Sequence, residues 1–221
     1  MKKLLMPLLL AATVLSATAN TPAGTKPATH AAALAAAVTP YQVQPQLSTI
    51  GWVGKKVTGQ HNGTVQFKSG QVLVKGTQIT GGTFVVDMTS LKNTDLTDAE
   101  TNGKLLGHLK SDDFFSIEKN PTATFVITSI KPLKGDAAGN NATITGNLTI
   151  KGKTNPLSFP AKMGVKNGVA AASGTATVDR TKYDIRYGSK SFFESIGDKA
   201  IDDTFALTFN VIAKASGVAT R

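Results

Sequence analysis

The chain of 221 residues contains no cysteine. No disulfide can therefore hold its fold together, and no thiol can act as a nucleophile or as a metal ligand. A lipoprotein anchor is also excluded, because such an anchor is attached to a cysteine. The folded part must be stabilised by its apolar core alone.

Histidine is nearly as scarce, with three residues in the whole chain. His61 and His108 could be combined with Asp112 or Asp113 into a zinc site, but no spacing typical of metal ligands joins them. The chain also has no nucleophile elbow and no glycine-rich phosphate loop. We therefore predict no catalytic residue and no metal site. A hydrolase or metal centre at His61 and His108 ranks third among the hypotheses, after two that involve neither catalysis nor a metal.

The N-terminus has the order of a secretory signal peptide. Lys2 and Lys3 precede an apolar run over residues 4–15, and Ala17-Thr18-Ala19 places small residues before a cleavage point. The apolar run is too short to span a bilayer as a helix. We therefore predict a signal peptide over residues 1–19 and an exported protein, periplasmic or extracellular.

Composition predicts the rest of the domain organisation. Residues 20–39 are almost wholly alanine, threonine and proline and offer no hydrophobic face, so we expect a flexible tether. Residues 40–215 form the expected folded domain, and residues 216–221 form a C-terminal tail. This length suits one domain with a sizeable core.

Basic residues outnumber acidic ones. The formal net charge is +10, and removal of Lys2 and Lys3 with the signal peptide would leave +8. In an exported protein this balance favours an anionic membrane surface or an acidic polymer over nucleic acid as a partner. The lysines are spread over many segments, which indicates a solvated cationic exterior.

From Tyr41 onward, apolar residues recur at every second position, as in strands with one buried face. The clearest run places apolar or small residues at each even position from 142 to 150. Turn sequences such as Lys151-Gly152 and Asn167-Gly168 separate these runs. The pattern predicts an all-β fold, an antiparallel lipocalin-like β-barrel of about eight strands.

We expect one or two short helices beside the strands. Thr97-Asp98-Ala99-Glu100 is typical of a capping box with Thr97 at the N-cap, and an apolar stripe at residues 105, 106 and 109 follows it. A second helical turn is expected near Ser191 to Ser195. The polar strand faces carry almost no Trp or Tyr, so they provide no aromatic girdle for a bilayer and we predict a soluble barrel.

A barrel of about eight strands is just wide enough to be filled by side chains or to hold one small ligand. Alanine and glycine at positions 170, 172, 174 and 176 leave room on one wall, which favours a cavity. The candidate pocket residues are the large apolar side chains of the inward faces, together with a candidate lid at Leu109, Phe114 and Phe115. The full set is Trp52, Val65, Phe67, Phe84, Val86, Leu109, Phe114, Phe115, Phe125, Ile127, Leu148, Phe159, Phe205 and Phe209.

Eight segments follow one another in the order of a known family pattern. The longest include Gly82-Thr83-Phe84-Val85-Val86-Asp87-Met88-Thr89-Ser90-Leu91 and Gly107-His108-Leu109-Lys110-Ser111-Asp112-Asp113-Phe114-Phe115. The others cover residues 41–43, 50–52, 57–65, 121–125, 146–152 and 179–188. On these segments, residues 41–214 resemble the YceI-like family.

The resemblance implies an exported lipocalin-like protein that binds a polyisoprenoid lipid, such as a quinone tail, in an elongated apolar pocket without catalytic residues. We therefore predict that the chain is not an enzyme and holds an isoprenoid-type ligand, quinone or polyprenyl, for transport, storage or sequestration. No cofactor other than this lipid is expected. His61, His108, Tyr183 and Arg186 are the candidates to meet its polar head group.

A filled barrel is the alternative. It would act as a secreted stress-related or interaction module through its cationic surface, and its binding would fall steeply with salt. Transient contact with a membrane surface and pairing into a homodimer are further expectations about partners. Nucleic acid is not expected to bind.

Overall fold

The computed structural model describes residues 37–194 and 196–215. The predicted signal peptide, most of the predicted tether and the predicted C-terminal tail lie outside these residues. Within them the elements include one α-helix, α1 (Ala99–Lys110), and short 3-10 helices over Pro45–Leu47, Arg180–Tyr183 and Gly197–Lys199. The strands are β1 (Val38–Val43), β2 (Thr49–Lys56), β3 (Gly59–Lys75), β4 (Gln78–Asn93), β5 (Thr122–Pro132), β6 (Ala142–Ile150), β7 (Lys153–Lys166), β8 (Val169–Asp179) and β9 (Ile201–Ala215).

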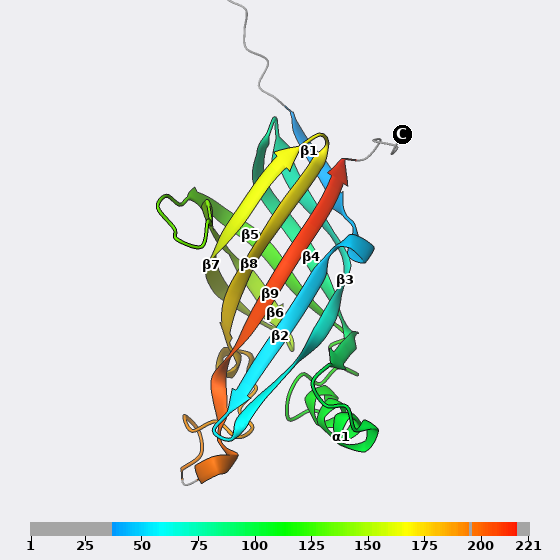
Figure 1. The fold of residues 1–221 in the computed structure, drawn as a ribbon, viewed down its shortest axis with the longest axis vertical. Helices are drawn as coiled ribbons and strands as arrows, with labels where there is room; N and C mark the ends of the chain where they lie inside the picture. The colour runs from blue at the N-terminus through cyan, green and yellow to red at the C-terminus, as the bar shows by residue number, and fades with distance from the viewer. Residues whose placement is uncertain (1–36, 195, 216–221) are drawn as a thin grey trace, which may run out of the picture. The chain divides into compact units, whose positions relative to one another are not determined.

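The strands form one closed antiparallel barrel, which confirms the predicted fold class (Figure 1). Neighbours follow the order β1-β3-β2-β9-β8-β7-β6-β5-β4, and an additional pairing of β3 with β4 closes the ring. Each strand thus has a partner on both sides. Closure removes the exposed edges that an open sheet would present to other chains.

β1 and β2 share one position in the barrel. β2 pairs with the first part of β3, β1 pairs with its last part, and both also pair with β9. At the break between them, the Gln44 N–H donates to the Ile212 carbonyl at 2.8 Å, and the Ile212 N–H donates to the Ser48 hydroxyl at 3.0 Å. The interruption therefore leaves the main chain of Ile212 paired, and nine strands fill eight positions.

Two hairpin turns follow the chemistry that the sequence indicated. Lys151 and Gly152 join β6 to β7 with φ of 50° and 71°, and Asn167 and Gly168 join β7 to β8 with φ of 50° and 72°. Two successive residues with positive φ are typical of the type I′ turn, whose twist matches that of the paired strands. These turns set the register in which inward positions of neighbouring strands face one another.

The α-helix begins one residue later than the capping-box pattern predicted. Its N-cap is Asp98, whose carboxylate accepts the Thr101 N–H at 2.8 Å and the Thr101 hydroxyl at 2.6 Å. A carboxylate suits this end because the helix dipole is positive there. Glu100, expected to complete the box, instead pairs with Lys104 at 2.6 Å.

The second helical turn was predicted in the wrong place. Residues 191–194 lie in a segment of turns, and the short 3-10 helix of this region lies at Gly197–Lys199. Among the described residues, no helix is both long enough and apolar enough to cross a membrane.

Glycines on the inner face let aromatic rings approach the barrel wall. A Cβ added to Gly146 on β6 would stand 2.5 Å from Cζ of Phe125 and 2.5 Å from the main-chain oxygen of Val126. A Cβ added to Gly174 on β8 would stand 3.0 Å from Cζ of Phe209. The small residue at position 174 therefore accommodates a ring, and does not leave an empty space as the sequence suggested.

The Gly146→Ala variant should lower the free energy of unfolding by about 1–3 kcal/mol, because the new methyl group overlaps both the Phe125 ring and the Val126 carbonyl. Urea denaturation measures the change. Gly164→Ala on β7 is the matched control, since a Cβ there meets nothing within 4 Å; its stability should be unchanged or slightly higher. Equal losses in the two variants would contradict the close approach at Gly146.

Candidate ligand-binding site

The barrel encloses two cavities with almost wholly apolar walls. Cavity 1 has a volume of about 120 Å³ and cavity 2 of about 190 Å³. An engineered cavity of about 150 Å³ lined by Leu, Ile and Phe stays dry and binds benzene. Cavity 2 exceeds that volume and cavity 1 comes close to it, so the interior contains apolar space that side chains do not fill.

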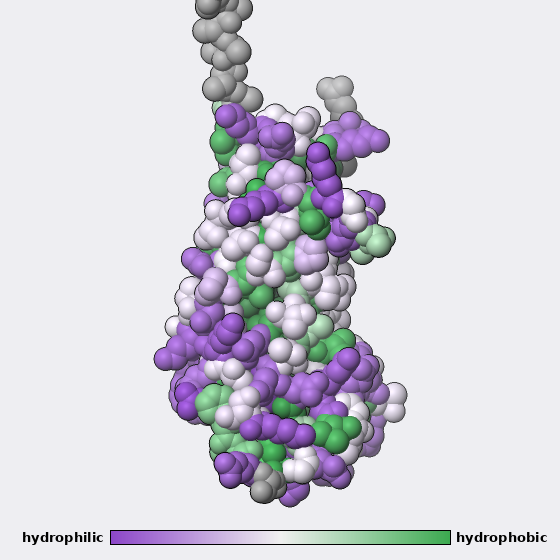
Figure 2. Space-filling view, turned by 90° about the vertical axis from the view of Figure 1, so that its left-hand side faces the viewer, coloured by the Kyte–Doolittle hydropathy of each residue, from purple (hydrophilic) through white to green (hydrophobic). Residues whose placement is uncertain are grey.

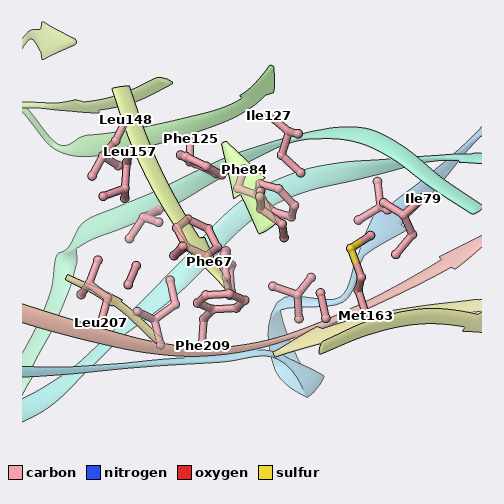
Figure 3. A pocket seen from close by; sticks show the side chains of 18 of the residues that line it. Phe67, Ile79, Phe84, Phe125, Ile127, Leu148, Leu157, Met163, Leu207 and Phe209 are labelled. Carbon is pink, nitrogen blue, oxygen red and sulfur yellow. The ribbon is translucent and has the colours of Figure 1, made fainter. Parts of the chain in front are cut away.

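Cavity 1 lies toward the end of the barrel that carries the β3–β4 and β7–β8 turns. A series of ring contacts runs along its wall (Figure 3): Phe67 lies 6.2 Å from Phe84, and Phe84 lies 6.5 Å from Phe125. The series continues from Phe125 to Phe159 at 5.5 Å and from Phe159 to Phe209 at 5.3 Å. These five rings come from β3, β4, β5, β7 and β9, so the contacts follow the wall around the cavity.

Four alanines of β8, at positions 170, 171, 172 and 176, complete the wall of cavity 1. Their short side chains contribute little volume, as the sequence indicated. The aliphatic residues of this wall include several that the candidate list omitted, namely Ile50, Val72, Ile79, Ile144, Leu157, Met163, Leu207 and Val211. Ile144, Leu157, Met163, Leu207 and Val211 stand at every second position of the runs over residues 142–150, 157–165 and 205–211, so their spacing was a signal that could have identified them.

Cavity 2 lies at the other end, beside α1. Leu105 and Leu109 of the helix reach its wall, as do Phe114 and Phe115 from the segment that follows. The Phe115 ring packs edge-on against Phe205 of β9, with centroids 6.3 Å apart. The helix and the segment after it therefore cover this end of the barrel interior.

Four aliphatic residues line both cavities. They are Ile50, Val86, Leu148 and Leu207, from β2, β4, β6 and β9. We call these residues the waist. Since the waist is made of side chains that can change rotamer, it separates the two cavities without a rigid wall.

The structure brings all fourteen predicted pocket residues to the cavity walls. Phe67, Phe84, Phe125, Ile127, Phe159 and Phe209 line cavity 1; Trp52, Val65, Leu109, Phe114, Phe115 and Phe205 line cavity 2; Val86 and Leu148 belong to the waist. Their role in binding a ligand stays a prediction.

His61 lies on the wall of cavity 2 and is oriented by Asp95. Its Nδ1 lies 2.8 Å from Oδ2 of Asp95, whose other oxygen accepts the Asn62 N–H at 2.7 Å. Partial burial alone would raise the pKa of Asp95, but hydrogen bonds from Asn62, His61 and Asn93 outweigh it and lower the pKa. An ionised Asp95 holds the proton of His61 on Nδ1, so Nε2 is the ring nitrogen that can meet a ligand.

The other three candidate head-group residues lie away from the cavity walls. The His108 ring packs edge-on against Tyr187, with centroids 4.5 Å apart, and Arg186 is exposed with its Nε 3.0 Å from the Asp184 carboxylate. Tyr183 is buried, and this burial raises its pKa to about 12. Of the four candidates, His61 is the one that lines a cavity.

Arg180 is a buried residue of cavity 2 that the sequence analysis missed. Its Nη1 donates to the carbonyls of Ile185 and Tyr187, each at 2.9 Å. Its Nε donates to the Asp202 carbonyl at 2.8 Å, and its Nη2 donates to the Ile201 carbonyl at 3.0 Å. One guanidinium thus fastens the segment after β8 to the start of β9, an arrangement that no local sequence pattern signals.

The arrangement of metal-ligating residues gives no support to the hypothesis of a hydrolase or metal centre at His61 and His108. Among residues 37–194 and 196–215, no three or more His, Asp or Glu side chains are grouped so that they could hold a metal ion. His61 pairs with Asp95, whereas Nε2 of His108 lies 3.3 Å from Asp113.

Replacement of Arg180 by methionine should lower the free energy of unfolding by about 3–5 kcal/mol, because it leaves four buried or half-buried carbonyls without their donor. Chemical denaturation measures the loss. Arg186→Met is the control, since this exposed arginine makes one ion pair with Asp184 and its loss should change stability by less than about 1 kcal/mol. Similar small losses in both variants would show that Arg180 does not fasten the segment.

The stabilisation from Asp95 should depend on pH. Its folded pKa is lowered from 3.8, so the stabilisation is fully present above 3.8 and is lost as the pH falls through the folded pKa. The difference in unfolding free energy between wild type and Asp95→Asn should therefore be larger at neutral pH than well below 3.8. A difference that stays constant over this range, measured by urea unfolding, would contradict the assignment.

Comparison with known proteins identifies sequence relatives of the chain. A family model described as YceI-like domain matches residues 41–213. A stretch of 56 residues is 50% identical to a "UPF0312 protein" of Pseudomonas aeruginosa, and a stretch of the same length is 43% identical to "Protein YceI" of Salmonella arizonae. Each stretch covers 25% of this chain and 27% of the relative, so the matches span about a quarter of the length of these relatives.

Two solved structures share the fold. BcnA of Burkholderia cenocepacia is 23% identical with a TM-score of 0.60, over 78% of this chain and 99% of BcnA. A structure described as a polyisoprenoid binding domain from Saccharophagus degradans is 14% identical with a TM-score of 0.57, over 81% of this chain and 99% of that domain. At these identities the likeness concerns the fold.

Proposed function

The chain belongs to the YceI-like domain family, and on that premise we propose that it is an exported lipid-binding protein that holds an isoprenoid-type ligand inside its barrel. The observation that carries the proposal is the pair of apolar cavities that share the waist residues as part of their walls. A structural relative described as a polyisoprenoid binding domain adds support. Transport, storage and sequestration are all compatible with such a site, and we propose that the protein binds the lipid without transforming it.

The walls of the cavities favour a hydrocarbon tail over a polar ligand. Burial of apolar groups contributes about 0.8 kcal/mol per CH₂, whereas association itself costs about 4–15 kcal/mol. A tail of about a dozen carbons therefore reaches useful affinity, and a much shorter one does not. The affinity of this site should accordingly depend on how much of the tail lies in the two cavities.

The polar groups of the site indicate which end of the ligand lies in which cavity. His61, Lys55, Lys56 and Asp202 line cavity 2, whereas the residues of cavity 1 are all apolar. We propose that the tail enters cavity 1 and that the head group stays in or beside cavity 2, within reach of Nε2 of His61. A neutral imidazole would accept a hydroxyl proton of the head group, and a protonated one would donate to a carbonyl oxygen.

Features of the sequence support the proposals on where the protein is located and what else it contacts. The signal-peptide pattern of residues 1–19 supports export to the periplasm or beyond the cell, and the positive net charge supports transient contact with a membrane surface. Homodimer formation is a further proposal, which the oligomeric state in solution would test.

Narrowing cavity 1 should shorten the tail that the protein accepts. Ala172→Leu adds three carbons to the wall of cavity 1, so it should weaken binding of long polyprenols about tenfold. It should leave the weaker binding of shorter polyprenols, which fit in cavity 2, unchanged. Titrations can follow the fluorescence of Trp52, the one tryptophan of the chain, because it lines cavity 2.

Thr175→Leu is the matched control on the same strand, because Thr175 is exposed. It should bind every polyprenol as the wild type does. Wild-type affinity that does not depend on tail length would contradict the proposed function, and equal effects of the two substitutions would contradict the role of cavity 1.

A further inference from the structure

Exposed apolar side chains gather at the end of the barrel that contains cavity 2. Seven large apolar residues of the described chain are exposed, and four of them belong to the β2–β3 turn and to the segment between β8 and β9. We call these four the aromatic patch: Val57, Tyr187, Phe192 and Phe193, each 45–53% exposed. The two segments touch, since the Val57 N–H donates to the Ala200 carbonyl at 3.1 Å.

The aromatic patch is held in place by specific contacts. The Tyr187 carbonyl accepts a hydrogen bond from the buried Arg180, and its ring packs against His108 of α1. The guanidinium of Arg186 lies 4.7 Å from the centroid of the Phe192 ring. The N–H groups of Phe192 and Phe193 both donate to the Ser189 carbonyl, at 3.2 and 3.0 Å. The apolar surface is thus built into the fold.

Positive charge surrounds the aromatic patch. Six exposed cationic residues lie at the end of β2, next to the turn, and on the segment between β8 and β9, namely Lys55, Lys56, Lys182, Arg186, Lys190 and Lys199. The exposed acidic residues there and at the start of β9 are Asp184, Glu194, Asp198 and Asp202, and Asp184 is paired with Arg186, so basic residues outnumber acidic ones by six to four. Figure 2 shows hydrophilic and apolar surface interleaved at this end of the barrel. Such a surface complements one that is apolar inside and negatively charged outside.

The aromatic patch also adjoins the wall of cavity 2. The Tyr187 ring lies 5.6 Å from the ring of Phe114, which lines that cavity. Lys55 and Lys56, next to Val57, line the same cavity. A bilayer in contact with the patch would therefore lie beside the wall of cavity 2.

We infer that the aromatic patch and its cationic rim dock the protein on an anionic phospholipid bilayer. Phe192, Phe193 and Val57 would enter the headgroup region, and the lysines would contact the lipid phosphates. This inference rests on the proposed function, because delivery or uptake of an isoprenoid lipid requires the cavity to face a membrane. It assigns that role to one end of the barrel, and the opposite end, with the β3–β4 and β7–β8 turns, would face away.

Flotation with lipid vesicles tests the inference. The full mature chain should float with vesicles of phosphatidylglycerol and phosphatidylcholine and much less with phosphatidylcholine alone, and binding should weaken as salt is raised. The double variant Phe192→Ser/Phe193→Ser should bind the anionic vesicles at least about tenfold more weakly. Leu47→Ser/Val126→Ser is the control, since these apolar residues are 51% and 42% exposed outside the patch, and it should bind as the wild type does.

Three results would contradict the proposed docking surface. They are no flotation of the wild type, equal losses of vesicle binding in both double variants, or vesicle binding that does not depend on lipid charge and salt. A dimer that forms without lipid and dissociates in the Phe192→Ser/Phe193→Ser variant would also overturn it, because a second copy would then cover the patch. If that variant fails to fold, Phe193→Ser with Leu47→Ser as control carries the test.

Failure of docking can be distinguished from failure of the proposed function. Polyprenol binding in the absence of vesicles, followed through Trp52 fluorescence, does not require the patch and should be unchanged in the double variant. Retained polyprenol binding without vesicle binding refutes only the docking surface. Vesicle binding without polyprenol binding refutes the proposed function and leaves the patch as a membrane-binding surface.

Discussion

The pairing of β3 with both of its neighbours is the constraint on which the rest of the structure depends. This strand of 17 residues contacts β1 and β2 on one side and β4 on the other, and so closes the barrel. In a closed barrel the main-chain N–H and C=O groups are satisfied within the wall, so the interior needs neither water nor polar side chains. An opened edge would expose unpaired groups to the interior, and the apolar cavities could not persist.

The interior is hollow because its large and small residues alternate around the wall. The phenylalanines of β5, β7 and β9 lie on either side of β6 and β8, which present Gly146 and Gly174 where the rings approach. Rings that lie over a glycine remain close to the wall. The alanines of β8 keep the facing wall thin, so space remains for a ligand along the axis of the barrel.

Much of this arrangement could be predicted from the sequence, because alternation with period two decides which side chains face inward. Eleven of the fourteen candidate residues lie on strands and reached the cavity walls for that reason. Leu109, Phe114 and Phe115 lie on α1 and in the segment after it, where alternation gives no signal. The turns at Lys151-Gly152 and Asn167-Gly168 have local signatures. The contacts of Arg180 could not be predicted, since its partners lie in two segments that only the closed barrel brings together. The division of the interior at the waist could not be predicted either, because it depends on how four strands face one another. The choice of Asp98 over Thr97 as the N-cap depends on which side chain accepts the Thr101 N–H.

The central claim is that the barrel holds an isoprenoid lipid with its tail in the two cavities. Native mass spectrometry of the protein, expressed from the full sequence of 221 residues and purified without detergent, tests this claim most directly. We expect a bound species whose mass increments are multiples of an isoprene unit and which disappears after extraction with organic solvent. A protein that carries only straight-chain lipids, or no adduct at all while polyprenols are present in the same cells, would contradict the claim.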